Sequence, residues 1–231
     1  MASTPAPNPD RRLAVLTGLL YLLTHVTSVT AAVLYAAGLP ADGGPIDAPL
    51  VLGGVALEFV LALGCIGTGV LVWRLLREAG PATAAGFAAL RLLEGAVIVV
   101  GTAPMLALVT LQARGALASG PLAALAEGAP DLHAAFFLLG QGLPISVNTI
   151  LLGTLLWRSE RVPRALAGLA IAGGAIVLLS NSAQLAGVIP NGGVVAGLGA
   201  LPIFAFELWW ALLLIVRGLR PAPAARAAVV H

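Results

Sequence analysis

Four charged side chains and one histidine interrupt the long apolar stretches of this sequence: His25, Glu58, Arg91, Glu94 and Glu207. Inside a bilayer such side chains are rare, and they usually face the interior of a helix bundle or a water-filled cavity. A carboxyl or imidazole group in such a place can hold and transfer a proton, and an arginine can fix a carboxylate. Four charges at about 2.5–3.5 kcal/mol each would cost roughly 10–14 kcal/mol in the bilayer. We therefore interpret these residues as candidates for a ligand or proton site.

The candidates lie at similar depths. With a rise of 1.5 Å per residue, His25, Glu58, Glu94 and Glu207 come out about 14–18 Å from one edge of the bilayer. Gln141 lies close to mid-depth in a further helix. Five predicted helices therefore each contribute one polar group to a thin layer, and we expect these groups to converge.

Four other polar residues form a secondary set: His133, Asn148, Asn181 and Gln184. On a helical wheel, His133 and Asn148 fall within about 80° of Gln141. Asn181 and Gln184 are three residues apart and share a helix face. We expect a structural or interfacial role for His133, near the outer edge, and interhelical hydrogen bonds for Asn181 and Gln184.

The charges inside the apolar stretches do not balance. They comprise three carboxyl groups and one obligate cation, Arg91. Arg91 can pair with Glu94 three residues later, or it can bridge to Glu207. At least one carboxyl then has no fixed partner, and desolvation favours its neutral form unless His25 is protonated or a cation binds. The alternative hypothesis is that these polar groups only pin helices together.

The sequence lacks the common catalytic and cofactor motifs. It contains no H-E-x-x-H or G-x-S-x-G string, and without any lysine it has no Walker-type phosphate loop. Two histidines and three glutamates at similar depth follow no metal-binding spacing, so we predict neither a metal nor another cofactor. The arginines form no basic patch with interleaved aromatic residues, which argues against nucleic-acid binding.

The composition is that of an integral membrane protein. Of 231 residues, 59% are hydrophobic and 10% charged, whereas a soluble domain carries about 25% charged residues. A soluble enzyme of this size would have too few charges to cover its surface. The single cysteine excludes a disulfide framework.

Six apolar stretches are long enough to span a bilayer, which needs roughly 20 residues per helix. We predict an all-α bundle of six transmembrane helices at 13–38, 50–73, 84–112, 132–157, 165–189 and 193–216. The proline-containing ends, residues 1–12 and 221–231, are predicted to be disordered tails. Residues 13–220 then form a single membrane domain.

The arginines predict the orientation of the bundle. All 12 basic residues are arginine, and ten of them flank one set of helix ends: Arg11, Arg12, Arg74, Arg77, Arg158, Arg161, Arg164, Arg217, Arg220 and Arg226. The opposite loops carry mainly acidic residues. The positive-inside rule therefore places both termini in the cytoplasm.

Several strings resemble a bacterial family of integral membrane proteins that is catalogued only as a domain of unknown function. They are Leu90–Gly95 with its Arg-x-x-Glu element, Asp131–His133, Leu155–Gly168, Phe206–Trp209 and Val216–Arg220. The family pattern matches Arg91, Glu94, His133, Pro163, Arg164 and Glu207. The resemblance covers most of residues 13–220 and implies about six spans in a bacterial cytoplasmic membrane. The resemblance implies no activity. It does not extend to His25 and Glu58, whose selection as candidate site residues rests on their depth alone.

Three functions remain open at this point. The first is a protein that binds a small molecule, or transports it with protons, in a cavity lined by the mid-bilayer polar groups. The second is an intramembrane enzyme acting on a lipid or prenyl substrate, with a glutamate and His25 as acid and base. The third is a structural or regulatory membrane component. The lipid bilayer is the one partner that the sequence identifies. The sequence predicts no oligomeric state.

Overall fold

The computed structural model describes residues 9–40, 44–115 and 126–221, and in these ranges the chain forms helices and turns without any strand. The helices are α1 (Pro9–Gly38), α2 (Ala48–Leu76), α3 (Pro81–Gly101), α4 (Ala103–Ala113), α6 (Ala129–Phe137), α7 (Leu143–Ser159), α8 (Arg164–Leu185) and α9 (Val194–Val216), with a 3-10 turn at Arg77–Ala79 and a π-helical turn at Leu138–Gly142. Within the described ranges, six segments are long and apolar enough to cross a membrane, with α3–α4 and α6–α7 each counting as one. The predicted all-α, six-helix membrane bundle is confirmed.

The helix boundaries lie within three residues of the predicted spans, apart from two differences of four residues. α1 begins at Pro9, so residues 9–12 are helical although the sequence places them in a disordered tail. Proline suits the first turn of a helix, and Asp10 there complements the helix dipole. The fifth span ends at Leu185 rather than at residue 189, because Gly187 adopts a left-handed φ of 70° just beyond the helix. Residues 1–8 and 222–231 of the predicted tails lie outside the described residues.

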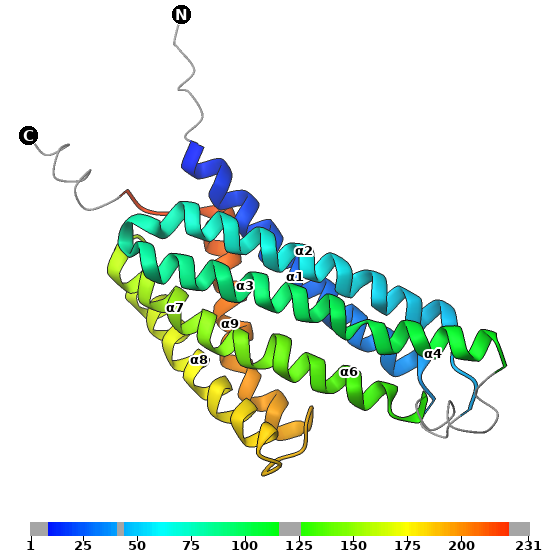
Figure 1. The fold of residues 1–231 in the computed structure, drawn as a ribbon. Coiled ribbons are helices and arrows are strands. Elements are labelled where there is room, and N and C mark those ends of the chain that lie inside the picture. Colours follow the sequence, from blue (N-terminus) through cyan, green and yellow to red (C-terminus); the bar gives the residue numbers. More distant parts are fainter. Residues whose placement is uncertain (1–8, 41–43, 116–125, 222–231) are drawn as a thin grey trace, which may run out of the picture.

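Both ends of the helical chain lie at one end of the bundle, which we call the terminal end (Figure 1). There the guanidinium group of Arg11 in α1 donates hydrogen bonds to the carbonyl oxygens of Leu214 and Ile215 at the close of α9. Arg161 likewise donates to the carbonyl oxygens of Leu75 and Arg220. Arginines therefore satisfy carbonyl groups that helix ends leave without intrahelical partners. The opposite end, where α8 connects to α9, is called the distal end.

The helices α1 and α9 pack more tightly against each other at the terminal end than toward the distal end. Phe87 and Trp210 are fully buried in the terminal-end core. A Cβ atom at Gly18 of α1 would lie 2.6 Å from the carbonyl oxygen of Ala211, so α1 and α9 are in backbone contact there. A Cβ atom at Gly197, nearer the distal end of α9, would meet no described atom within 4 Å. Figure 1 shows the α8–α9 connection lying apart from the distal ends of α2, α4 and α6.

Candidate functional site

The fourth span is interrupted at its centre by the π-helical turn Leu138–Gly142. The N–H of Leu143 bonds to the carbonyl oxygen of Leu138, five residues earlier, in place of the usual four. Pro144 follows directly and has no N–H to continue the α-helical pattern. Single π turns inside α-helices occur frequently at functional sites. This turn contains Gln141, one of the residues that the sequence places at mid-depth.

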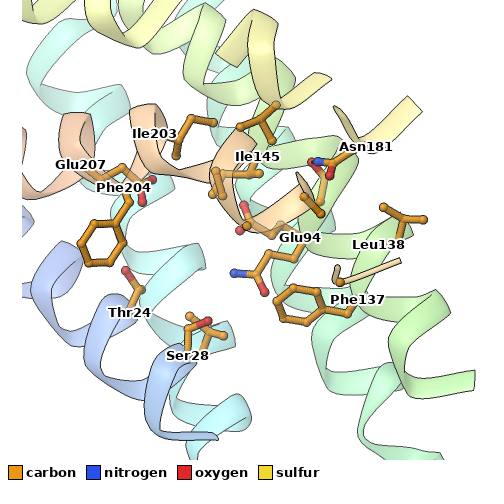
Figure 2. A pocket seen from close by; sticks show the side chains of 18 of the residues that line it. Thr24, Ser28, Glu94, Phe137, Leu138, Ile145, Asn181, Ile203, Phe204 and Glu207 are labelled. Carbon is orange, nitrogen blue, oxygen red and sulfur yellow. The ribbon is translucent and has the colours of Figure 1, made fainter. Parts of the chain in front are cut away.

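A cavity of about 360 Å³ lies beside this turn and is lined by residues of all six spans. Of the predicted site residues, it brings together His25, Arg91, Glu94, Gln141, Asn181, Gln184 and Glu207. Figure 2 shows Phe204 of α9 and Phe137 of α6 on opposite sides of this space, with Glu94 and Glu207 reaching toward it. The cavity therefore has aromatic walls and two carboxyl groups.

Arg91 and Glu94 form a closed polar cluster on α3. Arg91 Nη1 lies 2.9 Å from Glu94 Oε2, and both side chains are almost completely buried. The remaining guanidinium nitrogens, Nε and Nη2, donate to the Thr68 hydroxyl at 3.0 and 2.9 Å. Asn148 of α7 donates its Nδ2 to Glu94 Oε2 at 2.9 Å, and the Tyr21 ring lies 5.6 Å from the Arg91 guanidinium carbon. Of the two partners that the sequence allows Arg91, the structure selects Glu94.

The second carboxyl group of the cavity, Glu207, is held far less firmly. Its Oε2 lies 3.5 Å from His25 Nε2, which is long for a hydrogen bond. Among the described residues no donor reaches its Oε1. The His25 ring is oriented by its Nδ1, which lies 2.9 Å from the Tyr21 carbonyl oxygen, and by a tilted contact with the Phe204 ring at 4.8 Å between centroids. Glu207 and His25 thus face the cavity as a loosely joined pair.

The amide side chains on the distal side of the cavity differ in how well they are bonded. Asn181 donates to the Gly142 carbonyl oxygen in the π turn, and Gln184 donates to Asn181 Oδ1 at 2.9 Å. Gln184 Oε1 in turn accepts from the Gly192 N–H in the α8–α9 connection. Gln141 Oε1, in contrast, is buried and accepts no hydrogen bond from any described residue. Since buried polar atoms in proteins are nearly always bonded, Gln141 has an unfilled hydrogen-bonding capacity.

Glu58 does not join this cavity, although the sequence places it at the same depth. Its carboxylate lies 3.0 Å from His133 Nε2 and accepts a hydrogen bond of 3.0 Å from the Tyr35 hydroxyl. The Tyr35 and His133 rings also meet edge to face, with 4.9 Å between centroids. The three residues connect α1, α2 and α6 in a compact cluster. The structure therefore joins His133, for which the sequence predicts a structural or interfacial role, to Glu58, which the sequence counts among the ligand or proton candidates.

Sequence reasoning did not single out several residues that complete these clusters. Thr68 bonds Arg91, Tyr35 bonds Glu58, and Phe204 contacts His25. A weak signal existed for the tyrosines: both tyrosines of the chain, Tyr21 and Tyr35, lie in the first span about four helical turns apart, on one face. Thr68 and Phe204 carry no such signal, since Thr and Phe are common in membrane helices of any role.

Among the described residues, no group of three or more His, Cys, Asp or Glu side chains is placed to hold a metal ion. A family model described as Domain of unknown function (DUF4386) matches residues 16–218. The matched range contains all the strings on which the resemblance in the sequence is based, apart from the last two residues of Val216–Arg220. No curated protein and no solved structure matches the chain.

Proposed function

The chain belongs to the family described as Domain of unknown function (DUF4386), and from that premise, which brings no activity with it, we propose that the protein binds a small amphiphilic molecule in its membrane-embedded cavity. The ligand's polar group lies against His25, Gln141 and Glu207, and its apolar part lies along the aromatic walls. Binding, alone or as a step in proton-coupled transport, is the function that this arrangement supports best.

The size and lining of the cavity support this proposal. Ligand sites in proteins are typically concave spaces of about 300–1,000 Å³, mostly apolar, with a few polar groups that fix the ligand's orientation. The cavity here has a volume of about 360 Å³. Its apolar side chains include Leu61, Phe137, Ile145 and Phe204, and its polar groups come from different helices.

The single observation that carries the proposal is the buried, unbonded Oε1 of Gln141 on the π turn. A role confined to helix packing would favour an amide whose nitrogen and oxygen are both hydrogen-bonded, as those of Asn148 and Asn181 are. A ligand group would supply the missing bond, and rotation of the amide lets Gln141 offer either a donor or an acceptor.

A route into the cavity runs between α1 and α9 toward the distal end. The lining there includes Val29 and Phe204, which are exposed at 55% and 46%, and the open Gly197. These residues lie on membrane-spanning helices, so an amphiphile dissolved in the bilayer can reach the cavity sideways. The tight contact of Gly18 with α9 closes the same helix pair at the terminal end.

Equilibrium dialysis of the protein in lipid nanodiscs, against empty nanodiscs, tests this proposal with three probes of similar shape: phenyltrimethylammonium, tert-butylbenzene and benzoate. We expect saturable binding of at least one probe at one site. Gly197→Trp, which places an indole in the open part of the cavity, should abolish that binding. Leu198→Trp is the matched control, because Leu198 is 62% exposed and is not part of the lining. Absence of saturable binding, or equal loss in both variants, would contradict the proposal.

We also propose that the terminal end faces the cytoplasm of a bacterial cell, because the arginines gather there. The cavity then opens toward the outer side of the cytoplasmic membrane. The native Cys65 is buried, so it gives little background with an impermeant maleimide applied to intact cells. Asn191→Cys should be labelled and Glu78→Cys should not be. The reverse pattern would overturn this orientation.

A further inference from the structure

The titratable groups around the cavity come from α1, α2, α3 and α9. Glu207 of α9 faces Tyr21 and His25 of α1, Cys65 of α2, and Arg91 and Glu94 of α3. The lining residues of α6–α7, including the π turn, and of α8 are apolar or carry amides, with no titratable side chain among them.

The charges of Arg91 and Glu94 compensate each other, because the two side chains form an ion pair at 2.9 Å. Hydrogen bonds with Thr68 and Asn148 hold this pair in place. The net charge of the cavity is therefore decided by Glu207 and His25.

The hydrogen-bond geometry of His25 limits where the protons of this pair can lie. Its Nδ1 lies 2.9 Å from the Tyr21 carbonyl oxygen, which can only accept, so Nδ1 carries a hydrogen. Its Nε2 faces Glu207 Oε2 at 3.5 Å, and two lone pairs at that distance would repel each other. One further proton, either on Nε2 or on the carboxyl oxygen, would remove this repulsion and make the cavity neutral overall. Loss of that proton leaves a net charge of −1.

We propose, building on the proposed function, that the ligand is a small organic cation with an apolar group and that its binding displaces the proton shared by His25 and Glu207. The reaction is balanced: the cation enters, one proton leaves to the solvent, neutral His25 remains, and the Glu207 carboxylate pairs with the cation. The charge of the cavity is zero before and after, so no charge remains uncompensated in the bilayer.

Two features of the cavity favour a cation over an anion. The Glu207 Oε1 atom accepts no hydrogen bond from the described residues, whereas the Arg91 guanidinium group is already paired with Glu94 and has each of its three nitrogens in a hydrogen bond. The aromatic rings of Phe137 and Phe204 line opposite sides of the space (Figure 2). Aromatic faces attract organic cations, and quaternary ammonium groups in particular.

Isothermal titration calorimetry with phenyltrimethylammonium tests this inference on the wild-type protein in nanodiscs. The probe carries a fixed charge and cannot exchange a proton, so any proton released comes from the protein. Titrations in phosphate and in Tris buffer, whose heats of ionisation differ, should report one proton released for each cation bound. Where the pair holds its proton, the affinity should rise by about tenfold per pH unit, since binding and proton release are reciprocally linked.

The Glu207→Gln variant should bind the cation at least about tenfold more weakly and release no proton. Glu58→Gln is the matched control and should retain both the affinity and the proton count, because Glu58 lies outside the cavity lining. Binding of the cation without proton release in the wild type would overturn the inference, and this readout needs no variant to fold.

The probe series separates this inference from the proposed function. Saturable binding of tert-butylbenzene or benzoate that matches or exceeds that of phenyltrimethylammonium would refute a cation site while leaving a ligand-binding cavity in place. If none of the three probes binds saturably, both proposals fail.

Discussion

Among the described residues, two glutamate–histidine pairs lie within the membrane-spanning helices, and they differ in distance, in bonding partners and in access to the cavity. Glu58 and His133 are 3.0 Å apart, share a third partner in Tyr35, and stay outside the cavity lining. Glu207 and His25 are 3.5 Å apart, have no third donor among the described residues, and face the cavity. We call them the closed pair and the open pair.

The difference shows that residue type and depth do not decide the role of an ionisable group in a membrane. The closed pair uses its hydrogen-bonding capacity to join three helices, as buried polar clusters do when fully bonded. The open pair leaves a carboxyl oxygen available toward a space that a ligand can fill. Under the proposed function, bonding partners rather than location in the bilayer separate a structural group from a ligand-binding one.

Arg91 tests this rule most severely, because it lines the cavity like the open pair but is bonded like the closed pair. Arg91→Leu leaves Glu94 buried without its cation, and removal of one partner from a buried pair costs about 3–5 kcal/mol. We expect a loss of that size in the free energy of unfolding, measured by steric trapping in bicelles. Arg12→Leu, at an exposed site, should change it by less than about 0.5 kcal/mol. Similar losses in both variants would contradict the rule.

Neutralisation of each pair's glutamate compares the pairs directly. Glu58→Gln removes the charge from hydrogen bonds with His133 and Tyr35, and bonds to charged groups contribute about 1.5–3 kcal/mol. We expect an unfolding free energy lower by about 2 kcal/mol. Glu207→Gln should lower it by less than about 1 kcal/mol, because the contact with His25 is long and faces the cavity. A larger loss for Glu207→Gln would reverse the assignment of the two pairs.

Double-mutant cycles give the smallest and most specific effect. The coupling between Glu58 and His133 should be about 1 kcal/mol, within the range for residues in contact. The coupling between Glu207 and His25 should be below about 0.5 kcal/mol. The four single variants and the two double variants, unfolded under the same conditions, give both values. Equal coupling energies would show that the 3.5 Å contact is as strong as the 3.0 Å one.

The architecture could be predicted from the sequence because it depends on local properties. Length and hydropathy give the six spans, and the arginines mark the end at which both termini lie. Depth also placed His25, Glu94, Gln141 and Glu207 together, since depth follows from residue number at a constant rise. These four residues do line one cavity.

The direction in which a side chain points around the bundle axis could not be predicted in the same way, because this direction depends on which helices become neighbours. Glu58 lies at the expected depth but turns toward α1 and α6. The π turn adds a second source of error to the predicted direction of side chains around the bundle. Its one extra residue rotates all residues after the turn by about 100° relative to those before it. Gln141 lies within this turn, where a wheel drawn for a regular helix does not apply. Such a wheel puts His133 and Gln141 on one side, whereas His133 bonds Glu58 and Gln141 lines the cavity.

The most direct test of the central claim observes both pairs in one sample. In protein labelled with ¹⁵N-histidine in nanodiscs, the ring signals of His25 and His133 are assigned with His25→Asn and His133→Asn variants, and phenyltrimethylammonium is then added. We predict that the His25 Nε2 signal moves as the cation saturates and ends at the position of a neutral, unprotonated nitrogen without a proton donor. The shift is large if the displaced proton starts on Nε2 and smaller if the Glu207 carboxyl group donates it to Nε2. Both nitrogens of His133 stay unchanged. An unchanged His25 signal at saturation, or a shift at His133 alone, would contradict this prediction.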